Sequence, residues 1–399
     1  MEEWKVIQLK EVCELIPGFA FKSSEFGEHD YSAVKIGDIQ PPYVREEGLT
    51  GVDISRYSKE KLEKFKVYYG DFVLAMTGAT IGKIGRYIGT SGAYINQRVL
   101  LFRPKENVNK EYLYYCLQTP VFQQYIFNHI DSQTAQPNIS AGSVSGFEIL
   151  LPGISVQNKI ANILSALDSK IELNNRINHN LEEQAQALYK SWFVDFEPFR
   201  GGKFVDSELG LIPEGWNCIS LTDISMVFDS MRKPLSGMQR ENMKKLYPYY
   251  GATEIMDYVD NYIFDGIYLL IGEDGSVVRS NGAPFLQYVE GKFWSNNHAH
   301  VLQGTNGYST EMLHCALLNK NIKHAVTGAV QAKLSQSNMR KILLVLPPKD
   351  VSNGFDSIIQ SIYNSKRTIE RENNNLSKQR DNILPKLMSG ELKINDFTC

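Results

Sequence analysis

A stretch near the middle of the chain is repeated about half the chain length later. ISAGSVSGFEILLPGISVQNKIANIL begins at Ile139 and LSQSNMRKILLVLPPKDVSNGFDSII begins at Leu334, a step of 195 residues. Both stretches run from an aliphatic residue and a serine, through an apolar run that ends in proline, into a helical pattern. Because an internal repeat at a fixed step indicates a duplicated structural unit, we expect two similar halves.

Both repeated stretches lead into apolar residues spaced three and four apart, as in the seam of a coiled coil. One seam alone would leave an apolar stripe in water, whereas two similar seams can cover each other. We therefore expect two long helices that pair, and a duplicated unit favours an antiparallel, pseudo-twofold arrangement. The alternative is two unrelated surface helices, each packed on its own domain. The predicted seam is Ile160, Leu164, Leu167, Ile171, Asn178, Leu181, Leu188, Ile359, Ile362, Ile369, Asn373, Leu376, Ile383 and Leu387.

The segment before each helix is rich in glycine and aromatic residues, with short strand-like runs between turn signals. Strings recur in the same order in both segments: WKVIQLKEV and WNCISLTDI, GDFVLAMTG and DGIYLLIGEDG, AYINQRVLLF and FWSNNHAHVLQ, TAQPNIS and AVQAKLS. The sequence thus predicts an α+β protein with two β-rich modules joined by two long helices that form an antiparallel coiled coil. The predicted boundaries are 1–152 for the first module, 153–200 for the central helical spacer, 201–348 for the second module and 349–399 for the C-terminal helical spacer.

Composition narrows the class of protein. The chain of 399 residues is 43% apolar, which is enough for real cores, and its formal net charge is −3. Any nucleic-acid site must therefore be a local basic patch. The five cysteines contain no Cys-x-x-Cys pair, which argues against a disulfide framework or zinc ribbon and fits a reducing cytoplasm. MEEWKVIQLK is acidic and lacks an apolar h-region, so we do not expect it to be a signal peptide, and no apolar run is long enough to span a bilayer.

Motifs for catalysis are approached but not met. IQPPYV resembles the Asp/Asn-Pro-Pro-Tyr signature of amino-group DNA methyltransferases, but Gln40 stands at its first position and no glycine-rich cofactor turn lies nearby. GATIGKIGR has too few residues between its glycines for a phosphate loop, and Ile84 follows the lysine. GEDG lacks the converging carboxylates of a nuclease. We therefore predict no catalytic residue and no cofactor.

A metal site is also not predicted. The histidines of NNHAH alternate on an expected strand and would face the same side, but the sequence shows no obvious third ligand. We expect polar surface or a DNA contact there instead.

The sequence does contain basic and polar segments that are suited to binding. SMRKPLSGMQRENMKKLYPYYG carries five cations against one glutamate, followed by three tyrosines, which suits phosphate contacts and reading of base edges. In each case a solvated basic loop is the simpler explanation. The predicted DNA-binding residues of the first half are Lys22, Thr77, Thr80, Lys83, Arg86, Gln97, Arg98 and Gln136. Those of the second half are Arg232, Lys233, Arg240, Lys244, Lys245, Asn297, His298, Gln331 and Lys333.

MTGATIGKIG, LIGEDGS, NNHAH, LGLIPEGW, LPKLMSGEL and the long string from LPGISVQNKIANIL to YKSWFVDF resemble the specificity subunit of type I restriction–modification enzymes. The resemblance covers nearly the whole chain. It implies that the β modules are target recognition domains, each reading one half of a bipartite duplex DNA target. It further implies that the helices form an antiparallel spacer and dock two methyltransferase subunits, with restriction subunits joining through the complex. The second helix lacks the Gln-x-x-Ile start of the first, so the second docking surface is expected to be less equivalent.

The resemblance also implies no catalysis by this chain alone; the assembled complex would methylate adenine and cleave DNA with ATP. Two alternatives remain open at this point. A fused restriction or methylation enzyme would need a cofactor motif, which the sequence does not show. A coiled-coil scaffold or binding protein without a DNA role would not bind duplex DNA with sequence selectivity.

Overall fold

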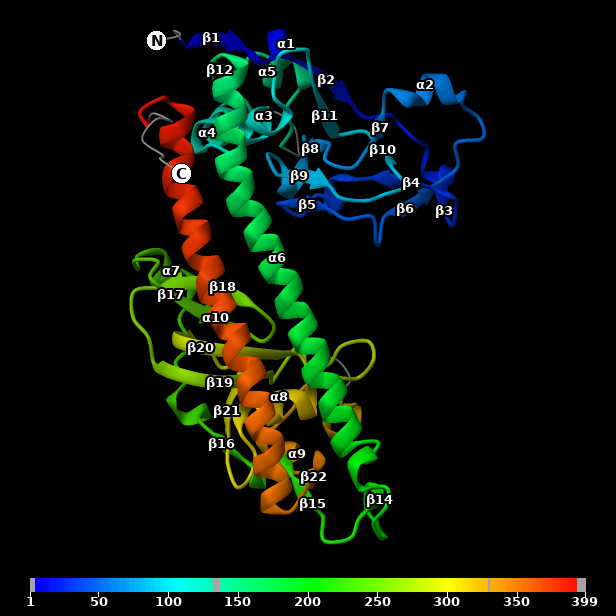
Figure 1. Ribbon diagram of the computed structural model, residues 1–399, viewed down its shortest axis with the longest axis vertical. Coiled ribbons are helices and arrows are strands. Elements are labelled where there is room, and N and C mark those ends of the chain that lie inside the picture. Colours follow the sequence, from blue (N-terminus) through cyan, green and yellow to red (C-terminus); the bar gives the residue numbers. More distant parts are fainter. Residues whose placement is uncertain (1–3, 132–136, 329–330, 393–399) are drawn as a thin grey trace. The chain divides into compact units, whose positions relative to one another are not determined.

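The computed structural model describes residues 4–131, 137–328 and 331–392. Contacts divide the chain into two compact units, Met1–Glu172 with Asn373–Cys399, and Leu173–Glu372. Each unit holds one module and a part of each of two long helices, which are labelled α6 and α10 in Figure 1. In the described part of the chain, no helix has an apolar stretch that could cross a membrane.

The first module is built from short strands, which its turn-rich sequence predicts. Among its described residues, two sheets have five strands each, in the orders β3-β6-β4-β10-β7 and β2-β11-β8-β9-β5, and β1 pairs with β12. The strands are β1 (Lys5–Gln8), β2 (Cys13–Pro17), β3 (Phe26–Gly27), β4 (Tyr31–Val34), β5 (Tyr43–Val44), β6 (Thr50–Val52), β7 (Lys66–Val67), β8 (Phe72–Ala75), β9 (Ile84–Tyr87), β10 (Ala93–Ile95), β11 (Val99–Pro104) and β12 (Glu148–Leu151). The short helices are α1 (Leu9–Val12), α2 (Lys59–Glu63), α3 (Lys110–Leu117), α4 (Pro120–Asn128) and α5 (Ala141–Ser145).

Strand β8 shows how the module fills its core. Phe72 and Leu74 pack in a cluster that includes both long helices, whereas Val73 and Ala75 pack in a second cluster on the other face. Successive strand residues point to opposite faces of a sheet, so a strand buried on both faces must be apolar throughout. This accounts for the unbroken run FVLA in the sequence.

The second module contains a larger sheet of six strands in the order β16-β21-β19-β20-β17-β18, the pair β15–β22 and the hairpin β13–β14, as far as its residues are described. The strands are β13 (Phe204–Ser207), β14 (Gly210–Pro213), β15 (Asn217–Ser220), β16 (Ser225–Val227), β17 (Tyr247–Tyr250), β18 (Ile255–Val259), β19 (Phe264–Gly272), β20 (Leu286–Ser295), β21 (Ala299–Gly304) and β22 (Leu343–Leu346). The short helices are α7 (Gly237–Glu241), α8 (Thr310–Leu318) and α9 (Gln336–Met339).

The repeat is visible in backbone pairing as well as in sequence. Strand β1 pairs antiparallel with β12 from Lys5 opposite Leu151, and β15 pairs in the same way with β22 from Asn217 opposite Leu346. The hydrogen bond from Leu9 N–H to the Phe147 carbonyl (2.8 Å) has its counterpart between Leu221 and Ile342 (2.9 Å). Helices α5 and α9 are capped by the side chains of Ser140 and Ser335, which are 195 residues apart. The predicted internal repeat is confirmed.

Helices α6 (Ile154–Phe193) and α10 (Lys349–Met388) pair in each unit. In the first unit, Ile160 and Leu164 share a core cluster with Leu384 and Leu387, and the Asp168 carboxylate lies 2.8 Å from Arg380 Nη1. In the second unit, Asn174 donates to Glu372 (2.8 Å), Glu182 lies 3.2 Å from Lys366, and Phe193 contacts Phe355. Residue numbers rise along α6 as they fall along α10, so the predicted antiparallel pairing is confirmed.

The predicted seam residues are all buried or half-buried. The structure adds buried residues that lie beside the seam, among them Tyr189, Tyr363 and Leu384. They are buried because the module of each unit covers a second face of the helix ends. The two helices are therefore not surface helices confined to one domain each, which was the alternative.

A buried ion pair fastens α10 to the second module. Glu311 of α8 is 3% exposed and Arg367 of α10 is 5% exposed, and Arg367 Nη1 lies 2.7 Å from Glu311 Oε1. Tyr288 and Gln360 also donate to the Glu311 carboxylate, at 2.7 and 2.8 Å. Burial by itself would raise the pKa of Glu311, but these hydrogen bonds and Arg367 hold the pKa below its ordinary value.

Removing the cation from this pair should destabilise the protein strongly. The Arg367→Met variant leaves the Glu311 carboxylate buried without its charge partner, which costs about 3–5 kcal/mol in the free energy of unfolding. Arg371→Met is the matched control, because Arg371 pairs with Glu290 on the surface and its side chain is 64% exposed; its loss should cost about 0–1 kcal/mol. Urea denaturation of the two variants measures the difference. Equal losses would show that the buried pair does not fasten the helix.

Candidate nucleic-acid interface

Three loops of the first module meet at one place. They are the turn after β8 (residues 76–83), the turn before β11 (96–98) and the segment before α5 (137–140). Met76 N–H donates to the Arg98 carbonyl (2.8 Å), and Ile139 N–H donates to the Met76 carbonyl (2.9 Å). Gly78 N–H donates to the Pro137 carbonyl (3.0 Å). We call this arrangement the three-loop platform of the first module.

The second module has the same platform, formed by residues 272–276, 296–298 and 331–335. Glu273 N–H donates to the His298 carbonyl (2.8 Å), Leu334 N–H to the Glu273 carbonyl (2.7 Å) and Gly275 N–H to the Ala332 carbonyl (3.0 Å). These are the same three hydrogen bonds at corresponding positions. The strings that recur in the two halves of the sequence are thus the strings that supply the loops.

The two platforms carry different side chains on the same backbone frame. In the first module, Gln97 and Arg98 are exposed, Lys83 is exposed, and the Arg98 guanidinium donates to Asn138 (3.3 Å). In the second module, Asn297, His298, Gln331 and Lys333 are exposed at the platform. Amide, imidazole and cationic groups of this kind read base edges and phosphates. A shared frame with different polar groups can bind two different sequences.

Other predicted residues of the first module lie in less favourable places. Thr77 is 8% exposed and its hydroxyl donates to the Pro137 carbonyl (3.0 Å), so it builds the platform. Thr80 is half-buried, and Lys22 is exposed three residues after Phe19, whose carbonyl accepts from Gln97 N–H (2.8 Å). Gln136 lies outside the described residues.

Arg86 does not fit its predicted role as a phosphate contact. Its side chain is 19% exposed, forms an ion pair with Glu111 of α3 and lies over the ring of Tyr114, with 4.2 Å from the guanidinium carbon to the ring centroid. Its charge is therefore engaged inside the module. Arg86 therefore stabilises the module, and its phosphate contact stays a prediction.

Arg232 is engaged inside its module in the same way, and its DNA contact also stays a prediction. Its side chain is 11% exposed, and Nη1 lies 2.7 Å from Glu273 Oε2 and donates to the Ala299 carbonyl (2.6 Å). Asp229 lies 3.4 Å from Nη2. The guanidinium thus links Glu273, in the first loop of the second platform, to Ala299, which directly follows the second loop. Of the remaining cations of the basic segment, Lys233 and Lys244 are exposed, while Arg240 and Lys245 share the Asp257 carboxylate, at 2.8 and 2.9 Å.

The two histidines of NNHAH do not face the same side, contrary to the expectation from strand alternation. Strand β21 begins at Ala299, so His298 lies in the preceding turn and its side chain is 47% exposed. His300 is buried, with Nδ1 2.6 Å from Asp229 and Nε2 2.6 Å from the Leu334 carbonyl. His298 instead contacts the carboxylate of Asp274.

Asp229, Glu273 and His300 bring ligand atoms within 4.8 Å of one another, as in a metal site. Arg232 already places its positive charge between the two carboxylates. Burial by itself would raise the pKa of Asp229, but hydrogen bonds from His300 and Gln336 and the charge of Arg232 lower it. The cluster therefore holds the second platform together with its own charges, and we do not assign a metal to it.

Sequence reasoning missed the residues that aim the exposed groups. Asp274, Asn138 and Gln336 are not among the residues predicted from the sequence. Asp274 contacts His298, Asn138 accepts from Arg98, and Gln336 donates to Asp229 (2.6 Å). Asn138 and Gln336 lie within or directly after the recurring strings, so the repeat itself was the signal that would have found them.

The two modules have equivalent platforms with different exposed polar groups, which is typical of a protein with two separate binding sites. The match to the type I restriction modification DNA specificity domain covers residues 1–183 and 213–378. The chain therefore belongs to the family of type I restriction–modification specificity subunits.

Individual relatives agree with this assignment. The chain is 26% identical to the type I restriction enzyme MjaIX specificity subunit of Methanocaldococcus jannaschii, over 99% of this chain and 95% of that one. It is 25% identical to the type I restriction enzyme HindI specificity subunit of Haemophilus influenzae, over 75% and 81% of the two chains. A crystal structure of the S subunit of a type I restriction–modification system from M. genitalium has the same fold, with a TM-score of 0.56, 17% identity and coverage of 97% and 96%.

Proposed function

We propose that this chain is the sequence-reading subunit of a type I restriction–modification complex, in which each module reads one half of a bipartite, asymmetric DNA target. The observation that carries the proposal is the duplicated three-loop platform, because one backbone frame presents different exposed side chains in the two modules. Family membership favours this function over a scaffold without a DNA role.

The proposed division of the chain follows from this function. Residues 1–152 and 201–348 are the two target recognition domains, and residues 153–200 and 349–399 are the spacer that sets the gap between the half-sites. The paired helices dock two methyltransferase subunits, and restriction subunits join through the complex. The chain itself supplies recognition, and methylation and cleavage belong to its partners.

The residues that we propose for DNA contact are the exposed ones. Contacts with phosphates and base edges need side chains that DNA can reach, and the side chains of Arg86 and Arg232 are only 19% and 11% exposed. The proposed contacts are Lys22, Lys83, Gln97, Arg98, Lys233, Lys244, Lys245, Asn297, His298, Gln331 and Lys333.

His298 offers a sharp test of reading by the second module. The contact between the Asp274 carboxylate and Nδ1 of His298 orients the exposed ring, so that Nε2 can form a hydrogen bond with a base edge in the major groove. The His298→Ala variant should therefore relax one position of one half-site, with a loss of about 1–3 kcal/mol of discrimination.

The measurement is the methylated sequence motif in cells that carry the complete complex, read by single-molecule sequencing. Asp274→Asn should relax the same position, because the residue acts through His298. His324→Ala is the control, since His324 is also exposed in the second module but bonds the Lys341 carbonyl (3.0 Å) away from the platform. An unchanged motif in both the His298 and Asp274 variants would remove His298 from the set of proposed contacts.

A further inference from the structure

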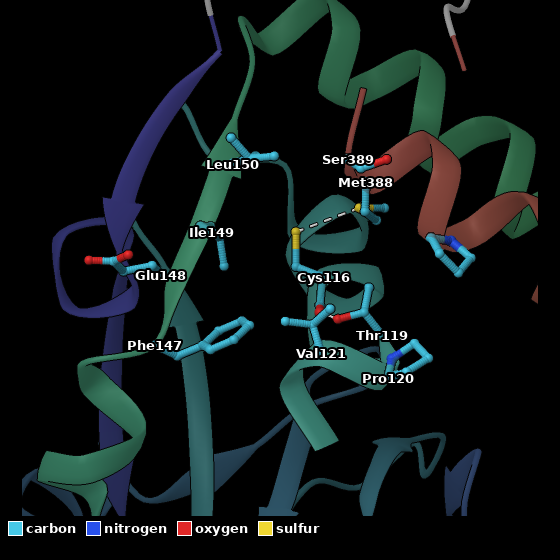
Figure 2. Close-up of a pocket in the computed structure, with 11 residues that line it drawn as sticks. Cys116, Thr119, Pro120, Val121, Phe147, Glu148, Ile149, Leu150, Met388 and Ser389 are labelled. Carbon is cyan, nitrogen blue, oxygen red and sulfur yellow. Dashed lines mark hydrogen bonds between the residues drawn. The ribbon is translucent and has the colours of Figure 1, made fainter. Parts of the chain in front are cut away.

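An apolar pocket lies in the first unit, among elements that are not part of its platform. Its volume is about 270 Å³, and its walls come from the end of α3 and the start of α4, from β12 and from the C-terminal end of α10. Figure 2 shows the side chains of Phe147 and Ile149 on one side and Met388 on the other, while Glu148 points away from the cavity. Cys116 Sγ lies 3.7 Å from Met388 Sδ at its back.

A second pocket, of about 410 Å³, lies in the second unit. Its walls come from the end of α8, from β22 and from the C-terminal end of α6. These are the elements that correspond to the walls of the first pocket under the internal repeat. The correspondence holds residue by residue: Pro385, Met388 and Ser389 stand 195 positions after Lys190, Phe193 and Val194, and Ile149 and Leu150 stand 195 positions before Leu344 and Val345.

The two pockets lie at corresponding places in the repeat, although their residues differ. Met388 in one pocket is Phe193 in the other, and Thr119 is replaced by Asn319, 200 positions later. Each pocket also has a valine that is largely in water, Val121 at 68% exposed and Val194 at 58% exposed. Apolar side chains exposed beside an apolar cavity are typical of a surface that another molecule covers.

The chain itself does not supply an occupant for both pockets. After Val194 it turns to place Phe196 and Phe199 against Trp216, with ring centroids 5.5 and 5.0 Å apart, and the described chain leaves the second pocket open. Ser389, directly after Met388, lines the first pocket, and none of the described residues that follow Met388 lines the second. An occupant of two equivalent pockets is most simply one that is itself present twice.

We propose that the two pockets are docking sites for two copies of the methyltransferase subunit, each inserting a bulky aliphatic or aromatic side chain. This inference rests on the proposed function, which calls for two copies of that partner. The methyltransferase subunit would then contact the chain where a module meets the end of a long helix, in addition to the outer faces of the helices. A single buried apolar anchor of this kind carries a large share of the binding energy at an interface.

The test places a charge at the mouth of each pocket. Val121→Glu and Val194→Glu are made singly and together, and Val205→Glu is the matched control, because Val205 is an exposed valine of the β13–β14 hairpin that lines neither pocket. Each chain is co-expressed with the methyltransferase subunit, and native mass spectrometry gives the stoichiometry. We expect two partners on the native chain and the control, one on each single variant and none on the double variant, with at least about a tenfold weaker affinity at each altered site.

Two further measurements decide the remaining outcomes. Circular dichroism and thermal unfolding of each isolated variant establish that the chain is folded, and Val121→Lys and Val194→Lys repeat the test with the opposite charge. Two partners on the folded double variant, with an unchanged methylated motif, would overturn the docking sites and leave the DNA-reading function standing. If the isolated native chain is a dimer and the double variant is a monomer, the occupant is a second copy of this chain and the proposal is wrong.

Discussion

Exchange of the second module for that of a family member with another target should change one half of the methylated sequence and leave the other half unaltered. The exchanged segment spans about residues 210–333, which includes the whole platform of the second module except its last loop residues. The expected effect is large, because each mismatched base pair costs about 1–3 kcal/mol of specific affinity and a half-site has several. Single-molecule sequencing of methylated DNA gives both half-sites in one experiment.

The structure specifies how the exchange must be made. Glu311 and Tyr288 lie inside the exchanged segment, but their partners Gln360 and Arg367 lie on α10, outside it. The hybrid chain should therefore also carry the donor's residues at positions 360, 364 and 367, so that no buried charge loses its partner. The reciprocal exchange of the first module is the control. A change in both half-sites from either exchange would contradict independent reading by the modules.

Lengthening both helices by four residues should widen the gap between unchanged half-sites by about two base pairs. Four residues add about 6 Å of helix, and one base pair rises about 3.4 Å. Sequence reasoning alone would place the insertion after Ala185, but Ala185 is fully buried in the core of the second unit, so an insertion there would pull Leu188 and Phe193 out of register with the module. The better places are after Asn175 in α6 and after Arg371 in α10, between the parts of the helices that the two modules cover.

An insertion in one helix alone is the control. With one helix longer than the other, the ion pair of Asp168 with Arg380 and that of Glu182 with Lys366 could not both form. This variant should therefore impair pairing of the two helices and should not lengthen the gap between the half-sites. The methylated motif again gives the result. Half-sites with altered letters and the original gap would show that the paired helices do not set the spacing.

The architecture could be predicted from the sequence because it depends on periodic and repeated patterns. The seam that contains Leu164 reveals one helix and its buried face. A second seam, which contains Ile359 and lies 195 residues later, reveals the partner helix. The roles of single cations could not be predicted in this way. Arg86 pairs with Glu111 and Arg232 with Glu273, which are 25 and 41 residues distant in the chain, and no local pattern shows such a pair.

The error at His298 has a different cause. Strand alternation predicts the side that a residue faces only inside the strand, and the strand boundary falls between His298 and Ala299. A shift of one residue at a strand end decides whether a histidine is buried or exposed. The loops that form each platform could be predicted, since their strings recur in both halves. Their close approach could not, because it depends on hydrogen bonds between residues far apart in the sequence.

The polar contacts between α6 and α10 favour pairing of α6 with α10 over pairing of α6 with a second copy of itself. Asp168, Asn174 and Glu182 of α6 meet Arg380, Glu372 and Lys366 of α10. The residues of α6 that stand 195 positions before those three partners are Ala185, Ile177 and Ile171. A homotypic pair made from two copies of the first half would therefore set each polar group of α6 against an apolar side chain. Helix α6 thus discriminates against its own copy, and the two helices have diverged so that α10 is the matched partner of α6.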